Sequence, residues 1–486
     1  MRPIRTILRT PLHGFFWLLL LFTLPFTLPS LELFFSGDHV MNLYLYVKRP
    51  EETLVNNLVF WTSFHRPLGG VAHLVIHTLF GMQPFWYWLF SIILFSLNTL
   101  LLLALYWRIT NDKYLALVAA GFAVLHPENY NVWYNFGAIY ELLVFGFLIS
   151  AFLCYLLFLE AEKGDKSRYW LCLILFIAAL NSKEIAVVFP AILAGYELIY
   201  RWDHISKSFG PVLLRLVPLF VISGVYALGK VLGREALWRN NSAYHYQLDE
   251  TAYCNLHGYF DLIVHRVMHF NDATLAWSLV SCLLLALLLR NRHMLFGLWF
   301  FLLTILPVLP LPRVWGLYLY VPLIGASLFL GSLGLEIGKR LVQIKCGREW
   351  ICVGVFYFVL YWAASGYVDG ALENRRAFSR EWRGFIEQLL EKYPVMSSNA
   401  LLGFENAPVR EGLDYHLHFL VALMYEDLKI KVFRLPEQED AFLRAKPGSG
   451  ESHHFDYADG RLVEVDEKVS PSIGETPLSA TGISPH

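Results

Sequence analysis

The sequence has few charged side chains and no cysteine pattern that would organise a fold. Only 16% of its 486 residues are Asp, Glu, Lys or Arg, whereas soluble domains usually carry about 25%. The formal net charge of −1 argues against nucleic acid as a partner. The six cysteines lack disulfide-framework or zinc spacing, so we interpret them as small apolar residues. No P-loop, G-x-G-x-x-G, serine-nucleophile motif, metal-ligand cluster or internal repeat is present in the sequence.

Long apolar runs dominate the chain instead. Hydrophobic residues make up 56% of it and the mean hydropathy is +0.46, which indicates that much of the surface faces lipid. A bilayer core about 30 Å thick needs roughly 20 apolar residues per crossing helix. We therefore predict an all-α polytopic membrane protein with about eleven transmembrane helices. The expected spans are Gly14–Leu31, Phe85–Tyr106, Tyr114–Leu125, Ala138–Leu159, Tyr169–Leu180, Ile185–Tyr200, Val212–Val231, Leu275–Leu289, Phe296–Leu311, Leu317–Leu335 and Ile351–Ala364.

Two of the apolar segments need a separate interpretation. The first run follows three arginines, as in a signal peptide, but it is long for one and lacks a convincing cleavage site. We expect a retained first helix. The stretch Pro67–Phe80 contains two histidines and suits an interfacial helix better than a span.

The distribution of Lys and Arg among the short loops predicts the orientation. Basic clusters recur in alternate loops, which places those loops on the cytoplasmic side. We expect a multi-pass integral membrane protein of the bacterial inner membrane, or of the endoplasmic reticulum in a eukaryote, with an extracytoplasmic active site. The outer loops then carry the ionisable residues Asp38, Arg66, His126, Glu128, Lys183, Glu184 and Arg313.

The chain changes character after the last apolar run. Asp369 to Lys392 alternates charged and apolar positions at helical spacing, which predicts an amphipathic helix. Beyond it, strand-like and helical patterns predict a small extracytoplasmic α/β domain, and Gly, Ser, Pro and acidic residues predict a disordered tail. The expected division is a transmembrane domain at 1–366, an α/β domain at 367–446 and a tail at 447–486.

Asp38 is the first candidate for chemistry, in Ser36-Gly37-Asp38-His39 just after the first apolar run. Ionisable groups beside membrane segments are functional hypotheses by default. A carboxylate there could take a proton from an acceptor hydroxyl while a phosphate leaves as an anion, a reaction that needs one base and a few cations. The alternative is that Asp38 caps a helix beginning near His39.

Three other outer segments carry cations or polar groups. Arg66, before Pro67, could hold a phosphate, pair with Asp38 or simply extend along the interface. Lys183 in Asn181-Ser182-Lys183-Glu184 stands at a helix N-terminus, a good phosphate site, unless the segment is a hairpin neutralised by a Lys183–Glu184 pair. Arg313 is a further cation. The segment from His126 through Glu128 and Asn131 to Trp133 suits sugar hydroxyls or merely ends a helix.

The long outer segment from Lys230 to Asp272 is rich in aromatic residues, among them Tyr246 and Tyr259. Such side chains could stack on sugars. They are equally typical of an aromatic belt at the level of the lipid headgroups.

The order of these motifs resembles the GT-C membrane glycosyltransferases, in particular the dolichyl-phosphate-mannose protein mannosyltransferase-like and TMTC-like branch. The matching pieces run in the family's order and spacing: Gly37-Asp38, Arg66-Pro67-Leu68, His126-Pro127, Ser182-Lys183-Glu184 with Pro190, and Tyr318-Leu319-Tyr320-Val321-Pro322 with Gly325. Three positions depart from the family: relatives often have a second acid where His39 stands, an acid where Asn131 stands and an arginine where Leu317 stands. Tetratricopeptide repeats, present in some members, are absent here.

The resemblance implies an inverting glycosyltransferase that uses a polyprenyl-phosphate sugar donor. Asp38 is the expected catalytic base, and Arg66, Lys183 and Arg313 are expected to bind the donor phosphate. The acceptor is a protein, lipid or glycan. No metal is expected to be obligatory, although the resemblance leaves room for a divalent ion. The residues expected to position sugar and acceptor are His39, His65, His126, Glu128, Asn131 and Glu184.

Two other functions remain open from the sequence. A transporter or flippase would explain polar groups near the membrane, but transporters usually show internal repeats and broken helices at mid-membrane. A catalytically degenerate scaffold is the second alternative, in which the C-terminal domain recruits partners.

Overall fold

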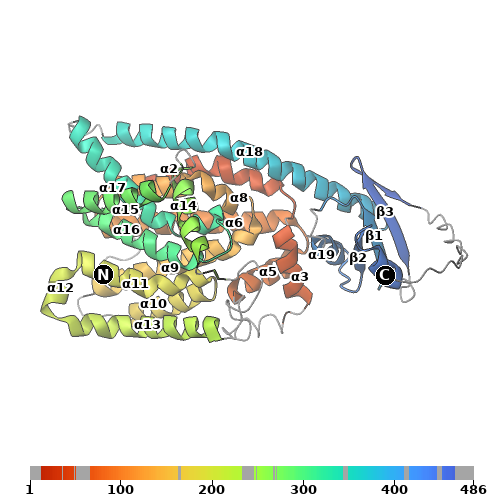
Figure 1. Ribbon diagram of the computed structural model, residues 1–486, viewed down its shortest axis with the longest axis horizontal. Helices are drawn as coiled ribbons and strands as arrows, with labels where there is room; N and C mark the ends of the chain where they lie inside the picture. Colours follow the sequence, from red (N-terminus) through yellow and green to blue (C-terminus); the bar gives the residue numbers. More distant parts are fainter. Residues whose placement is uncertain are drawn as a thin grey trace, which may run out of the picture. The chain divides into compact units, whose positions relative to one another are not determined.

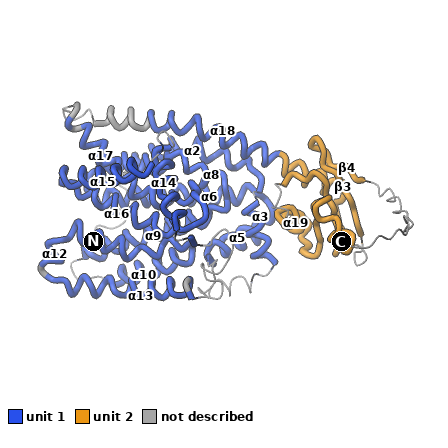
Figure 2. The backbone as a smooth tube through the Cα atoms, viewed as in Figure 1, with its two compact units in different colours: residues 1–380 blue, residues 381–486 orange. Residues whose placement is uncertain are grey.

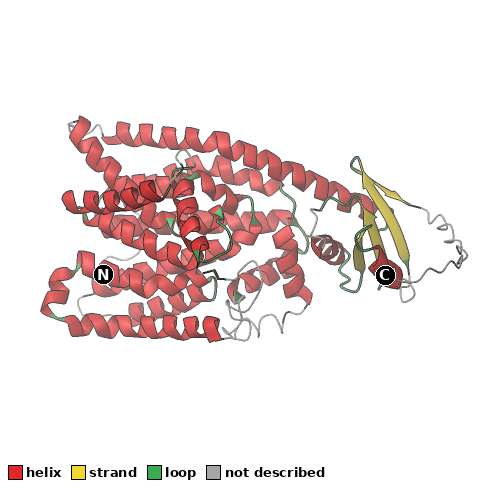
Figure 3. Ribbon diagram, in the orientation of Figure 1, coloured by secondary structure: helices red, strands yellow, loops and turns green. Residues whose placement is uncertain are grey.

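The protein is mainly helical and divides into two compact units, residues 1–380 and 381–486 (Figure 2). The computed structural model describes residues 12–35, 37–48, 50, 66–161, 166–232, 246–247, 249–265, 269, 271–342, 349–409, 415–445 and 451–465. Within these ranges, strands occur only in the second unit (Figure 3).

Within the described ranges, the first unit is built from helices, most of them joined by short turns (Figure 1). Its α-helices are α2 Leu12–Thr27, α3 Gly37–Lys48, α5 Pro67–Phe80, α6 Pro84–Thr110, α7 Lys113–Leu125, α8 Tyr130–Trp133, α9 Ile139–Leu159, α10 Lys166–Leu180, α11 Phe189–Tyr200, α12 Trp202–Lys207, α13 Phe209–Leu232, α14 Glu250–Ile263, α15 Asp272–Leu288, α16 Arg292–Ile305, α17 Leu323–Val342 and most of α18 Glu349–Lys392. Its 3₁₀ turns are η1 Leu28–Glu32, η2 Pro127–Asn129, η3 Phe136–Ala138, η4 Glu184–Val188, η5 Leu306–Val308 and η6 Gly316–Leu319.

Each of the eleven predicted spans overlaps an α-helix, but several also include 3₁₀ turns, and few are long enough to cross a bilayer alone. Four helical segments among the described residues have the necessary length and apolar composition: 13–32, 84–110, 136–159 and 209–230. The number of spans, the retained first helix and the orientation therefore stay predictions. The stretch expected to be interfacial forms α5 with the predicted bounds, and its position relative to a membrane is likewise a prediction.

Close helix packing fixes the centre of the first unit. Where α16 crosses α17, a Cβ added to Gly297 would lie 2.7 Å from the Gly325 carbonyl oxygen, and one added to Gly325 would lie 2.5 Å from that of Gly297. The two backbones can approach so closely only because both residues are glycine. Gly331 of α17 packs in the same way against Ala119 of α7. α17 therefore forms a fixed support for the turns that precede it.

Helix α18 runs along α2, with Tyr361 against Phe22 and Phe26 (Figure 1). Ser379 Oγ accepts a hydrogen bond from the Phe34 backbone N–H at 2.5 Å. Arg376 pairs with Glu32 at 3.1 Å. The predicted amphipathic segment is thus part of a longer continuous helix, and it holds the chain just before Asp38.

The second unit contains a four-stranded mixed sheet in the order β2-β1-β3-β4. Its strands are β1 Leu401–Glu405, β2 Lys431–Leu435, β3 Ser452–Ala458 and β4 Arg461–Glu464, and its helices are α19 Tyr415–Met424, α20 Glu439–Ala445 and the end of α18. β1 pairs in parallel with β2 and β3, and β4 is antiparallel to β3. The predicted β-α-β pattern is present as β1, α19 and β2.

The extent of this unit differs from our expectation. It begins at residue 381 rather than 367, because the amphipathic part of α18 is continuous with the bundle. Residues 452–464, which fell in the expected disordered tail, form β3 and β4. Polar composition hid these strands, since β4 is a sheet edge with only half-buried or exposed side chains.

A charged network ties the β3–β4 hairpin to the end of α18. His453 lies between Glu451 and Glu464, with each ring nitrogen 2.9 Å from a carboxylate oxygen. Glu464 also accepts a hydrogen bond from the Tyr393 hydroxyl at 2.7 Å and pairs with Lys392 at 3.0 Å. Burial alone would raise the pKa of Glu464, but the hydrogen bonds from His453, Tyr393 and Lys392 outweigh it and hold this pKa at about 2.

This network predicts that the hairpin is acid-sensitive. Because the folded-state pKa of Glu464 lies below its ordinary value, its ionisation stabilises the fold above about pH 4.5, and this contribution is lost as pH falls toward 2. The protection of residues 452–464 in the full chain, taken as the exchange rate relative to that of the unfolded chain at the same pH, should therefore fall between pH 5 and pH 3. In Glu464→Gln this protection should already be low at pH 5. An acid response as steep in Glu464→Gln as in the wild type would assign it to other groups.

Candidate functional site

A buried group of charges joins the start of α5, the turn before α11 and the end of α13. Arg66 precedes α5, and its guanidinium pairs with Glu184 of η4 at 3.0 Å. Lys230 of α13 approaches the other oxygen of the same carboxylate at 3.6 Å. Arg66 and Lys230 are 7% and 5% exposed, so the charges are almost removed from water. One carboxylate thus holds two cations from different helices.

A second buried ion pair lies next to the first. Lys183 contacts Glu141, which projects from the first turn of α9. The Lys183 ammonium also lies 4.4 Å from the ring centre of Tyr318 in η6. Tyr140, the neighbour of Glu141, supports the Arg66 guanidinium at 5.2 Å from its ring centre. Both ion pairs therefore contact the start of α9, one through Tyr140 and the other through Glu141.

These contacts correct two of our alternatives. Arg66 pairs with Glu184 and not with Asp38, and Lys183 pairs with Glu141 rather than with its neighbour Glu184. The segment 181–184 is consequently not a self-neutralised hairpin. Its two charges point to different partners because Lys183 is extended while Glu184 begins a 3₁₀ turn.

Sequence analysis missed Glu141 and Lys230. The signal was present, because Glu141 is the only acidic residue in the apolar run 138–159 and Lys230 lies near the end of the run 212–231. Charges inside such runs are functional hypotheses by default.

Asp38 packs against the turn that precedes α9. It belongs to the first turn of α3, which begins at Gly37, so Asp38 is part of the helix rather than a residue before it. A Cβ added to Gly137 of η3 would lie 3.2 Å from the Asp38 Cβ. Gly137 is four residues before Glu141, at the entrance to α9. The half-buried carboxyl-bearing turn of α3 thus packs against the segment that carries Tyr140 and Glu141.

His39 faces the interior of the bundle. Its ring is fully buried and packs against Phe35, Tyr87 and Phe136, with ring centres 4.7, 4.7 and 4.4 Å away. Neither ring nitrogen has a hydrogen-bond partner among the described residues. Its contacts are those of a packing residue that fixes α3 against η3, which differs from the expected contact with sugar or acceptor. His65 lies outside the described residues.

A second polar group gathers around Glu128 of η2. The Asn131 side-chain amide donates to the Glu128 backbone oxygen at 3.1 Å and lies 3.3 Å from its carboxylate. His265, just after α14, approaches the other carboxylate oxygen at 3.7 Å. Gly316 of η6 closes the group, because any Cβ at that position would collide with the Glu128 carboxylate. Glu128 is 3% exposed and is held from three segments.

His126 and Arg313 have different surroundings from those expected. His126 accepts a hydrogen bond from the Glu128 N–H and places its other ring nitrogen 3.0 Å from the Ile263 carbonyl oxygen, so it joins η2 to α14. Arg313 is exposed and stacks on Trp315 at 4.7 Å. It lies on the same loop as η6 without joining the buried charges.

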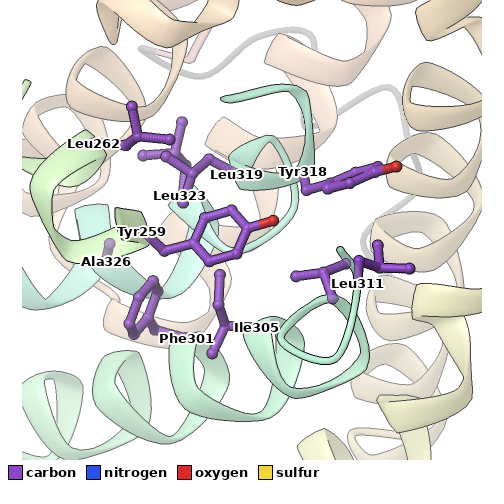
Figure 4. Packing of buried hydrophobic residues seen from close by; sticks show 10 residues of the cluster. Tyr259, Leu262, Phe301, Ile305, Leu311, Tyr318, Leu319, Leu323 and Ala326 are labelled. Carbon is purple, nitrogen blue, oxygen red and sulfur yellow. The ribbon is translucent and has the colours of Figure 1, made fainter. Parts of the chain in front are cut away.

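The aromatic outer segment is partly a core element. Tyr259 of α14 is fully buried with Phe301, Ile305 and Leu319 (Figure 4). The Tyr246 hydroxyl donates to the Pro307 carbonyl oxygen at 2.9 Å. These two tyrosines therefore pack the protein and are not free to stack on a sugar.

The opposite end of α9 carries a separate set of charges. Arg108 pairs with Glu160, and Glu197 binds Arg215 at 2.8 Å and the Tyr155 hydroxyl at 2.6 Å. A helix rises 1.5 Å per residue, so Tyr155 lies about 21 Å along α9 from Glu141. The charged residues of the predicted outer loops and those of the predicted inner loops thus lie near opposite ends of α9. Within the described part of the chain, no three His, Cys, Asp or Glu side chains are arranged to hold a metal ion, and the absence of an obligatory metal stays a prediction.

The buried pairs predict a large stability loss when one partner is removed. Glu184→Gln should lower the free energy of unfolding by roughly 3 kcal/mol, because Arg66 and Lys230 would remain buried without their counter-charge. Thermal unfolding in detergent measures this. The control is Glu160→Gln, whose pair with Arg108 is about half exposed, and its cost should stay under about 1 kcal/mol. Equal losses in both variants would contradict the importance of burial.

One comparison with known proteins matches the part of the chain that carries most of these charged residues. A family model described as dolichyl-phosphate-mannose-protein mannosyltransferase matches residues 65–227, about a third of the chain. That range contains Arg66, Glu128, Glu141, Lys183 and Glu184. No curated protein is detectably similar in sequence.

Solved structures share the fold over nearly the whole chain. The crystal structure of ArnT from Cupriavidus metallidurans in the apo state aligns with a TM-score of 0.52 at 11% identity, covering 92% of this chain and 93% of ArnT. ArnT bound to undecaprenyl phosphate aligns with a TM-score of 0.48 at 11% identity, covering 91% and 92%. The first alignment shows a common fold. Residues 65–227 thus resemble the dolichyl-phosphate-mannose-protein mannosyltransferases, and the chain as a whole shares the fold of ArnT.

Proposed function

We propose that the protein transfers a sugar from a polyprenyl-phosphate donor to an acceptor hydroxyl at the extracytoplasmic face of the membrane. The acceptor O–H bond breaks, and its oxygen forms a bond with the anomeric carbon from the side opposite the phosphate. The bond between that carbon and the phosphate oxygen breaks, with its electron pair leaving on the phosphate. The products are an inverted glycoside and a polyprenyl phosphate, and the proton goes to a base on the protein.

The observation that carries this proposal is the convergence of Arg66, Lys183 and Lys230 from three segments. The three cations lie in surroundings with little water, in contact with the carboxylates of Glu141 and Glu184. Fixed cations in a water-poor site stabilise a leaving phosphate better than mobile water does. Arg313, exposed at the rim, is a further cation for the approaching donor.

Asp38 is the proposed base. A phosphate leaves as an anion without a general acid, so one carboxylate suffices, in contrast to the pair that glycosidases use. Its half-buried place on α3, against the entrance to α9, supports access both to solvent and to the charge cluster. Glu128, Asn131 and His265 are proposed to position sugar and acceptor hydroxyls, while His39 and His126 act indirectly through packing and through α14.

The role of Asp38 as the base can be tested by substitution. Asp38→Asn should abolish sugar transfer, because the amide cannot take the acceptor proton, while the amount of folded protein is unchanged. Product formation from a polyprenyl-phosphate sugar by the purified protein in detergent is the measurement. Asp203→Asn on α12 is the matched control and should remain active, since that exposed residue lies outside both polar groups. Full activity of Asp38→Asn would refute the role.

The role of Lys183 in binding the donor phosphate can be tested in the same way. Lys183→Met should weaken binding of undecaprenyl phosphate about 30-fold, the effect of one lost charge-assisted contact. Since the single variant leaves Glu141 buried without its partner, the double variant Lys183→Met/Glu141→Leu should bind as weakly while remaining well folded. Exposed Lys113→Met is the control and should bind like the wild type. Undiminished binding by the double variant would remove Lys183 from the site.

A further inference from the structure

Turn η6 connects the two polar groups that the proposed function requires. Tyr318 presents its ring to the Lys183 ammonium at 4.4 Å. Two residues earlier, Gly316 lies directly against the Glu128 carboxylate and the Asn131 amide, so that any side chain at this position would displace them. A single 3₁₀ turn therefore contacts both the cation cluster and the Glu128 group.

The same turn is held rigidly from behind. Leu319 is fully buried with Tyr259, Phe301 and Leu323, and Figure 4 shows the Tyr318 side chain extending away from Leu319. The next residue, Tyr320, packs on Phe145 at 4.6 Å and lies 3.3 Å from the Asn98 amide. Because these anchors fix the backbone, Gly316 and Tyr318 cannot move independently.

The contact between Tyr318 and Lys183 differs in kind from the one between Glu141 and Lys183. A carboxylate and an incoming phosphate compete for the same ammonium protons. The aromatic face attracts the cation without occupying those hydrogen-bond directions, so it continues to hold Lys183 when a phosphate takes the place of the carboxylate. Tyr318 is thus suited to keep Lys183 in place in both states.

We propose that η6 is a positioning segment, in which Tyr318 holds Lys183 and Gly316 seats Glu128, so that the two halves of the site are energetically coupled. This inference rests on the proposed function. Tyr318 and Gly316 act through Lys183 and Glu128. The coupling means that a change at Glu128 alters phosphate binding at Lys183, although Glu128 lies against His265 and Lys183 pairs with Glu141.

The ring contact is tested by binding of undecaprenyl phosphate to the purified full chain in detergent. Tyr318→Leu should bind about tenfold more weakly, the size of a desolvated cation–π contact. Tyr318→Phe, which keeps the ring face, should recover affinity to within about threefold of the wild type. The matched control is Tyr200→Leu, which removes a tyrosine ring beneath Arg292 at the far end of α11 and should leave affinity unchanged. Wild-type affinity in folded Tyr318→Leu would overturn the inference.

The coupling is tested by a double-mutant cycle with Glu128→Gln. This change should weaken undecaprenyl phosphate binding about fivefold in the wild-type background and have little effect in Tyr318→Leu, because the connecting contact is already lost. Additive effects would overturn the coupling. A wild-type protein that binds no undecaprenyl phosphate would overturn the proposed function itself, whereas normal binding with additive variants removes only the role of η6.

Discussion

The structure depends on the pairing of buried charges at the entrance to α9. Removing an ammonium or carboxylate from water costs several kcal/mol, and this cost is offset only when each charge has a partner at contact distance. Glu141 and Glu184 provide those partners for Lys183, Arg66 and Lys230. Helices that are too short to be secured by their own apolar length, such as α5 and α11, are thereby fixed to the long helices α9 and α13.

The same pairing explains why a site can exist here at all. Cations that attract a phosphate would repel one another in an apolar bundle, so the two carboxylates make their assembly tolerable before any ligand arrives. Aromatic rings from Tyr140 and Tyr318 add contacts that do not consume hydrogen-bond donors. Helix α3 packs against η3, so Asp38 lies at the turn before α9. The close crossing of α16 and α17 supports η6.

Much of the helical fold follows from the sequence, because apolar runs and the breaks between them are local features. The eleven predicted ranges overlap helices, and two of the predicted site residues, Arg66 and Glu184, form an ion pair. The partners could not be assigned in the same way. Whether Lys183 meets Glu184 or Glu141 depends on helix packing, and His265 carries no pattern that relates it to Glu128. The burial of His39 could not be predicted either, because a histidine next to an acidic residue in the sequence gives no indication of which way its ring faces.

The Arg66, Lys183 and Lys230 cluster bears on the turnover of the proposed reaction. A glycosylated polyprenyl phosphate is a diester with a single negative charge, whereas the departing monoester carries between one and two negative charges near neutral pH. The cations therefore attract the product more strongly than the donor. Glu141 and Glu184, which contact the same cations, offset part of that attraction and ease the release of the product into the headgroup region.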